Sequence, residues 1–196
     1  RPGAVTVPVE EEKDRILPVI SRLADRSAPI AVDTRKADVA AAAIDAGADV
    51  VNDVTGLRSP EMRRVVAEHD VPVVLMHSID APVDPNRTVT YDDVVEDVVR
   101  DLTERILLAE RAGIDREQIV VDPGLGFGKA PEESFEILSR IGEFGGLGCP
   151  VLVGHSHKSM FDLVDCGADE RLAPTVATTT LAADRDVDVV RVHDVA

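Results

Sequence analysis

Residues 30–53 decide the fold, because they contain one complete strand–helix–strand unit, IAVDTRKADVAAAAIDAGADVVND. Its apolar runs, Ile30-Ala31-Val32-Asp33 and Val50-Val51-Asn52-Asp53, are nearly continuous, which is typical of parallel strands buried on both faces. The alanine-rich segment from Lys36 to Ala46 predicts a helix between them, and Gly47 suits the position just past a helix end. The unit therefore predicts a parallel sheet with crossover helices.

The same unit recurs to the end of the chain. Further apolar runs predict strands at residues 72–76, 119–122, 150–154 and 189–192. Patterns typical of helices lie between them at residues 60–68, 91–112 and 131–141, with a weaker one at 175–183. Strands that alternate with helices predict an α/β fold, here with about six β–α units.

Two architectures fit this alternation, an open doubly wound sheet and a TIM (β/α)8 barrel. Polar residues end nearly every predicted strand, so ligand groups would come from around a ring, which favours the barrel. Arg1-Pro2-Gly3 resembles the end of an earlier strand, and about six strands cannot close a barrel without unpaired edges. We therefore predict one domain over residues 1–196, an incomplete barrel that is a fragment of a longer polypeptide.

The composition excludes several kinds of partner. The chain has 37 acidic against 21 basic residues and a formal net charge of −16, so its surface should repel nucleic acid and anionic membranes. Such a surface suits adaptation to high salt, although an ordinary acidic protein is the alternative. No apolar run is long enough for a membrane span.

Two cysteines without a metal-binding spacing indicate a reducing compartment, so we expect a cytoplasmic protein.

Acidic and amide side chains end three of the predicted strands. These are Asp33, Asn52 and Asp122. Buried polar groups need partners, and a flat heterocycle with an amide-like edge would supply them, because a carboxylate accepts N–H groups and Asn both donates and accepts. The alternative is that each residue caps a helix or pairs with a neighbouring lysine.

Cationic side chains follow the last two predicted strands, in Val153-Gly154-His155-Ser156-His157-Lys158-Ser159 and Arg191-Val192-His193-Asp194. Lys158 and Arg191 at strand ends are typical of a clamp for phosphate or carboxylate, joined by Arg1 if the N-terminus folds onto the same edge. His193 can donate a proton to a leaving oxyanion or accept one. For Arg191 the alternative is a salt bridge to one of the many acids.

Other motifs carry weaker signals. The glycine-rich segment 122–129 is neither a dinucleotide-binding fingerprint nor a P-loop, and Phe127 within it is either a lid or a packing plug. His155-Ser156-His157 has no evident third metal ligand, and Ser156 lacks the surroundings of a hydrolase nucleophile, so we expect no protein metal site. The proline-containing segment 78–89 is expected to be a mobile loop that covers the site.

In order along the chain, the motifs resemble those of the dihydropteroate synthase family. They are Arg1-Pro2-Gly3-Ala4, Val32-Asp33-Thr34, Val51-Asn52-Asp53, Leu75-Met76-His77, Asp122-Pro123-Gly124-Leu125-Gly126-Phe127-Gly128-Lys129, Ser156-His157-Lys158-Ser159 and Arg191-Val192-His193-Asp194. The resemblance implies a TIM barrel that joins 6-hydroxymethyl-dihydropterin pyrophosphate to 4-aminobenzoate and releases pyrophosphate, in folate biosynthesis. It also implies Mg²⁺ bound mainly through the substrate pyrophosphate, a possible homodimer, and a place in a multidomain folate enzyme.

The resemblance assigns a role to each site residue. The pterin would be held by Asp33, Asn52, Met76, Asp122 and Lys158, and the pyrophosphate by Arg1, Arg191 and His193. Phe127, Ser156 and Lys158 would lie near the aminobenzoate, and Gly154 would line the same substrate site. Lys158, Arg191 and His193 would be the catalytic residues.

The chain departs from the family pattern in several places. It has no counterpart of the family's first strand and loop or of its final helix, and His157 stands where the family usually has Arg. We therefore expect the 196 residues alone to be a poor or inactive enzyme. Two alternatives stay open, a non-catalytic pterin-binding module and a methyltetrahydrofolate-type methyltransferase of the same barrel family.

Overall fold

The computed structural model describes residues 6–79 and 89–195, and six parallel strands form its centre. The strands are β1 (Ala31–Asp33), β2 (Val50–Asp53), β3 (Val73–Met76), β4 (Ile119–Asp122), β5 (Leu152–Val153) and β6 (Val189–Val190). The first four pair in chain order, and β5 pairs with β6. A single parallel bridge between Val121 and Val151 joins the two groups. All six carboxyl ends therefore point the same way.

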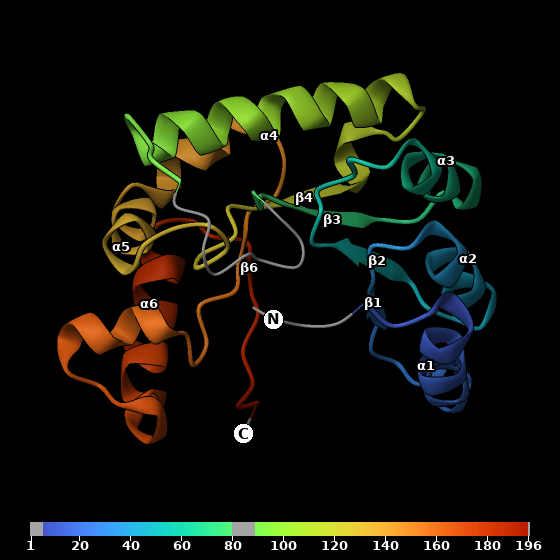
Figure 1. Ribbon diagram of the computed structural model, residues 1–196, viewed down its shortest axis with the longest axis horizontal. Helices are drawn as coiled ribbons and strands as arrows, with labels where there is room; N and C mark the ends of the chain where they lie inside the picture. Colours follow the sequence, from blue (N-terminus) through green and yellow to red (C-terminus); the bar gives the residue numbers. More distant parts are fainter. Residues whose placement is uncertain (1–5, 80–88, 196) are drawn as a thin grey trace.

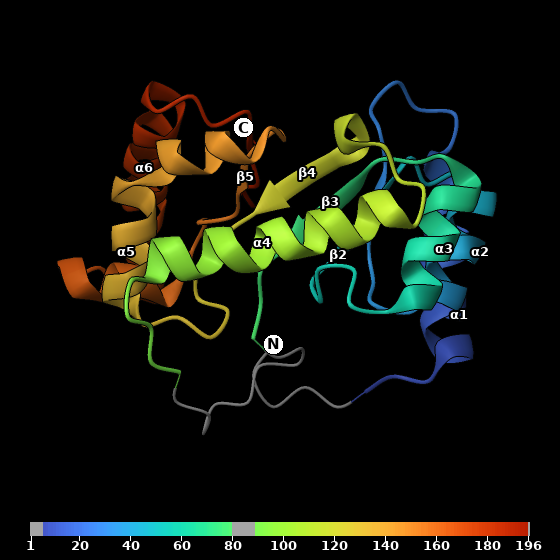
Figure 2. The same cartoon turned by 90° about the horizontal axis from the view of Figure 1, so that it is seen from above.

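Helices cover the outside of the strands, which curve into a horseshoe (Figure 1). The helices are α1 (Val9–Leu23), α2 (Ala37–Asp45), α3 (Pro60–His69), α4 (Val94–Arg111), α5 (Pro131–Ser139) and α6 (Leu172–Asp184). The described residues also contain four short 3₁₀ helices, η1 (Arg116–Gln118), η2 (Ile141–Leu147), η3 (Ser159–Val164) and η4 (Ala168–Glu170). Figure 2 shows α4 running along the length of the molecule, across β3 and β4.

Local sequence explains where the helices begin and end. The Ser59 side chain accepts a hydrogen bond from the Met62 amide (3.2 Å) at the start of α3, and Asp93 accepts from two amides at the start of α4. Gly47 has a φ of +108°, a conformation that favours glycine after α2. Gly47 was expected in this role.

The core is mainly aliphatic, as the low aromatic content predicts, although Phe144 and Phe161 are also buried in it. One face of α4 buries Val95, Val98, Leu102 and Ile106 against the outer sides of the strands. This packing places the helices outside and leaves the carboxyl ends of the strands for polar side chains. In the described part of the chain, no helix is long and apolar enough to cross a membrane.

The α/β fold and the parallel sheet are confirmed, with local differences. Helix α1 was not expected, because Pro18 interrupts its pattern, although Glu10, Glu11 and Glu12 form an acidic first turn that suits a helix start. The last two strands are shorter than predicted, and α6 starts three residues earlier than the predicted 175. Among the described residues no pairing joins β6 to β1, so the cylinder is open on that side.

Candidate active site

The predicted acidic and amide residues meet at the carboxyl edge of the sheet. Asp33 and Asn52 are direct neighbours in the pairing of β1 with β2, and Asn52 Nδ2 donates to Asp33 Oδ2 at 2.9 Å. Asn52 is buried, and its Oδ1 has no hydrogen-bond partner among the described residues. The Asp33 side chain remains 60% exposed. A free amide oxygen and an open carboxylate side by side can accept N–H groups of a ligand.

Asp122 lies deeper, beside Met76 in the register of β3 with β4. It is 1% exposed and accepts a hydrogen bond from the Gly124 amide at 2.7 Å. Burial raises the pKa of this carboxyl, while the charge of Lys158 acts in the opposite direction. Met76 is fully buried and forms an apolar wall next to the acid.

Lys158 connects the acidic part of the site to Phe127. Its Nζ donates to the Leu125 carbonyl oxygen and lies 4.8 Å from the centre of the Phe127 ring, within cation–π range. Burial lowers the pKa of Lys158 to about 8, against the attraction of Asp122. Phe127 therefore lies against Lys158 at the site and is not a packing plug elsewhere.

Arg191 and His193 follow β6 at the open side of the cylinder. Arg191 Nη1 lies 3.8 Å from Asp33 Oδ2, and the Arg191 side chain is 41% exposed, so it can receive an anion. A Cβ at Gly154 would lie 3.0 Å from Arg191 Nη2, so glycine leaves room for the guanidinium. The cations and the acids therefore share one opening.

Ser156 holds His193 by two contacts. The His193 amide donates to Ser156 Oγ at 3.2 Å, and His193 Nδ1 lies 3.0 Å from the same oxygen. The His157 ring packs edge-on against His193, with 5.6 Å between ring centres, and its Nε2 lies 2.5 Å from Asp194 Oδ2. His157 therefore faces Asp194 in this conformation.

Not every candidate side chain reaches the site. Arg1 and most of the predicted loop, residues 80–88, lie outside the described residues. Asp53 caps its own turn, since it accepts hydrogen bonds from the Thr55 and Leu57 amides at 2.8 and 3.0 Å. His155 is buried away from the opening, with Nε2 2.9 Å from Thr179 Oγ1 on α6.

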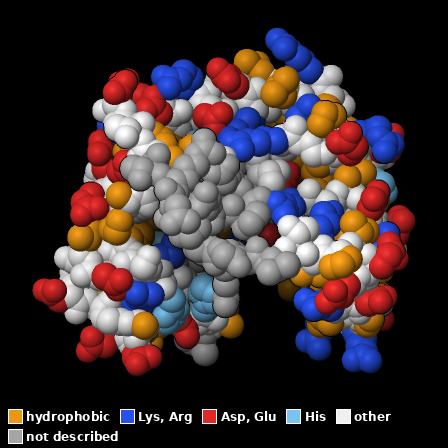
Figure 3. Space-filling view, in the orientation of Figure 1, with side chains coloured by type: hydrophobic (Ala, Val, Ile, Leu, Met, Phe, Trp, Pro, Cys, Tyr) orange, Lys and Arg blue, Asp and Glu red, His pale blue; other side chains and the backbone are white. Residues whose placement is uncertain are grey.

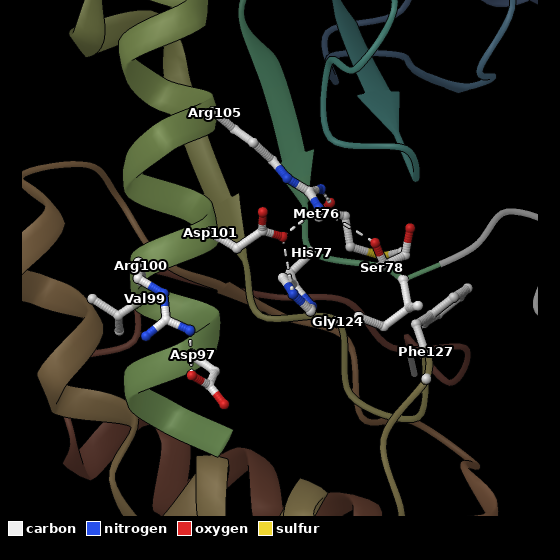
Figure 4. A network of polar contacts seen from close by, with 12 residues as sticks. Met76, His77, Ser78, Asp97, Val99, Arg100, Asp101, Arg105, Gly124 and Phe127 are labelled. Carbon is white, nitrogen blue, oxygen red and sulfur yellow. Dashed lines mark hydrogen bonds and ion pairs between the residues drawn. The ribbon is translucent and has the colours of Figure 1, made fainter. Parts of the chain in front are cut away.

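Polar side chains behind the site were not predicted. His77, Asp101, Arg105 and Lys129 form a network that links α4 to the ends of β3 and β4, shown in part in Figure 4. His77 and Lys129 each end one of the motifs quoted from the sequence, which was the available signal. Asp101 and Arg105 lie on α4, where no motif indicates which side chains face the strands.

Basic side chains lie beside the opening. In Figure 3, acidic and basic side chains both occur around the outer margin, and Lys, Arg and His side chains also lie on both sides of the hollow. In a chain with 37 acidic residues, these cations favour an anionic ligand at the opening.

Comparison with known proteins gives consistent matches. The family model described as "Pterin binding enzyme" matches residues 1–193. A Haloferax volcanii protein named "Probable bifunctional folylpolyglutamate synthase/dihydropteroate synthase" is 64% identical over 195 residues, and the match covers 100% of this chain but 23% of that protein. A relative of the same name from Halobacterium salinarum is 63% identical over 195 residues, with 100% of this chain and 24% of the relative covered. The chain therefore spans about a quarter of these two relatives.

Shorter relatives and solved structures match over most of their length. The dihydropteroate synthase of Bacillus subtilis is 42% identical over 198 residues, with 100% of this chain and 67% of the relative covered. The structure of Xanthomonas albilineans dihydropteroate synthase with 4-aminobenzoic acid superposes with a TM-score of 0.92 at 46% identity, covering 100% of this chain and 71% of that one. The architecture is therefore that of these TIM barrels.

Proposed function

The chain belongs to the pterin binding enzyme family and, within it, to the dihydropteroate synthases, and from this premise we propose that the complete protein condenses 6-hydroxymethyl-dihydropterin pyrophosphate with 4-aminobenzoate. One observation carries the proposal. The acidic and amide residues share an opening with Arg191, which lies 3.8 Å from Asp33. A substrate with a polar heterocycle at one end and a diphosphate at the other fits that polarity.

The heterocycle would bind through acceptors and an apolar wall. Asp33, Asn52 and Asp122 would accept its ring N–H and amino groups, and the unpaired Asn52 Oδ1 would gain a partner. Met76 would pack against its face. Lys158, near Asp122 and over Phe127, would contact both the pterin and the aminobenzoate.

The chemical step would need no covalent intermediate with the protein. The C–O bond between the pterin methylene and pyrophosphate breaks, and its electron pair leaves with the oxygen. The aminobenzoate nitrogen forms the new C–N bond and loses one proton, which the departing pyrophosphate can accept. Acidic groups disperse the positive charge on the methylene, while Lys158, Arg191 and His193 stabilise the leaving anion.

Mg²⁺ would be held mainly by the diphosphate oxygens. Arg191 and His193, which would face the diphosphate, do not fit as ligands of a hard divalent cation, which prefers oxygen. Within residues 6–79 and 89–195 there is also no group of three or more His, Cys, Asp or Glu side chains arranged to hold a metal ion.

The chain would act as one barrel domain of a larger cytoplasmic folate enzyme. Its 64% identity to the bifunctional Haloferax protein supports a multidomain arrangement. We also propose, from the family resemblance, that the protein forms a homodimer. The 196 residues alone are expected to have little activity.

The deciding experiment measures pyrophosphate release from the dihydropterin substrate by the full-length protein in high salt. Release should require 4-aminobenzoate, and Lys158→Ala and Arg191→Ala should each abolish most of it. A non-catalytic module would bind pterin without release, and a methyltransferase would require a corrinoid partner. Release that is independent of the amine and unaffected by both substitutions would overturn the mechanism.

A further inference from the structure

Lys129 is a buried lysine whose three ammonium hydrogens all have acceptors. The residue is 8% exposed, and its Nζ lies 2.8 Å from His77 Nδ1, 3.0 Å from the Gly124 oxygen and 3.3 Å from the Phe127 oxygen. Burial lowers the pKa of Lys129 to about 7, against the attraction of Asp122, and in the charged form its three ammonium hydrogens match these three acceptors. Lys129 therefore closes the loop from Gly124 to Phe127 and ties it to β3.

The contact with Asp101 sets the tautomer of His77. Because the carboxylate only accepts, the ring proton lies on Nε2, 3.1 Å from Asp101 Oδ2, and Nδ1 of the neutral ring accepts from Lys129. Burial lowers the pKa of His77 to about 4, which keeps the ring neutral. The carboxylate of Asp101 therefore orients the ring that receives Lys129.

Arg105 ties this arrangement to the strand ends. It pairs with Asp101, and its Nη1 donates to the carbonyl oxygens of Thr55 and Met76, each at 3.2 Å. In Figure 4 the Arg105 and Asp101 side chains extend from α4 toward His77 and Met76. Helix α4 thus supports the back of the site through two ionic side chains.

The loop that Lys129 closes carries contacts of the candidate site. The Leu125 oxygen accepts from Lys158, and the Phe127 ring lies beneath the same ammonium. A side chain at Gly124, where φ is +67°, would collide with the His77 carbonyl oxygen. Small movements of this loop would therefore displace Phe127 and Lys158 together.

We propose that Lys129 is a positioning residue, which acts with His77 and Asp101 to hold Phe127 and Lys158 in place for the arylamine substrate. This inference rests on the proposed function. Lys158 would contact the pterin as well, but Asp33 and Asn52 lie on β1 and β2, where strand pairing places them independently of the loop. Loss of Lys129 should therefore affect the amine more than the pterin.

The first test compares Lys129→Met with Arg116→Met in the full-length protein. Arg116 also donates to a backbone carbonyl outside its own element, that of Leu147 at the end of η2, at 2.9 Å, but it precedes β4, at the opposite end of that strand. Lys129→Met should raise the KM for 4-aminobenzoate roughly tenfold and change the KM for the pterin by less than about threefold, because the loop sets only part of the site. Arg116→Met should change neither KM.

A second pair of variants covers the case in which Lys129→Met does not fold. Asp101→Asn weakens the contact with His77, and Asp97→Asn, one turn earlier on α4, removes an exposed pair with Arg100. Of these two variants, only Asp101→Asn should raise the KM for the amine. The increase should be about threefold, because Asp101 acts on Lys129 indirectly, through His77.

The outcomes separate this inference from the proposed function. If the unmodified protein makes product and the network variants match their controls in both KM values, the positioning role is wrong and the proposed function stands. Equal increases in both KM values would also overturn the positioning role, because they would indicate that the whole site has lost its structure. An unmodified protein that forms no product from the amine would overturn both.

Discussion

Arg191 and Asp33 face each other across the open side of the cylinder, with 3.8 Å between Nη1 and Oδ2. Arg191 follows β6 and Asp33 ends β1, the two strands at the edges of the described sheet. The pair therefore brings the proposed anion-binding end of the site next to the proposed heterocycle-binding end. Four predictions follow from this geometry and from the charge around it.

Asn52→Ala should weaken pterin binding. The substitution removes the free Oδ1 and the 2.9 Å hydrogen bond to Asp33. We expect the Kd for the pterin substrate to rise about tenfold, which corresponds to about 1.4 kcal/mol. Calorimetric titration of the full-length protein measures it, with the exposed Asp38→Asn on α2 as control. An unchanged Kd would remove Asn52 from the site.

Gly154→Ala should weaken binding of the diphosphate by crowding Arg191. The added Cβ would lie 3.0 Å from Nη2, so the guanidinium must shift. We expect the Kd for pyrophosphate to rise by about threefold to tenfold, equivalent to about 1 kcal/mol. Gly145→Ala is the matched control, because a Cβ there meets nothing within 4 Å. Equal affinities for the two variants would contradict the crowding.

The activity should fall as the pH rises through about 8, the lowered pKa of Lys158. Below this pH the lysine is charged and can stabilise the leaving anion, and above it the charge is lost. Lys158→Arg, where it retains turnover, should move this alkaline limb upward, since arginine stays charged. The pH profile of kcat/KM measures both. An alkaline limb that is the same in both proteins would assign it to another group.

Salt should stabilise the protein. The net charge of −16 produces self-repulsion, which weakens as the Debye length falls from about 10 Å at 0.1 M salt to about 3 Å at 1 M. We expect the Tm to rise over this range of KCl, and to rise more than in sucrose of equal osmolality. A Tm that follows sucrose alone would show that screening has no part.

The sequence predicts the strand ends well for a physical reason. Each of Asp33, Asn52 and Asp122 follows an apolar run, and a parallel sheet gathers such ends at one edge. The network behind the site could not be predicted in this way. Arg105 meets the Thr55 carbonyl across 50 residues, and this contact depends on how α4 is rotated against the strands. No local pattern encodes that rotation.

Helix α1 was missed because Pro18 breaks the helical pattern.

A single bridge, between Val121 and Val151, joins the group of strands β1 to β4 to the group of β5 and β6. Asp33, Asn52, Met76 and Asp122, which would hold the heterocycle, lie on the first group of strands, and Lys158, Arg191 and His193 follow strands of the second. A substrate that contacts both groups of strands would act as a cross-link between them, and its release would allow the two groups to move independently. Slow hydrogen exchange at β5 and β6 would then report substrate occupancy from outside the pocket.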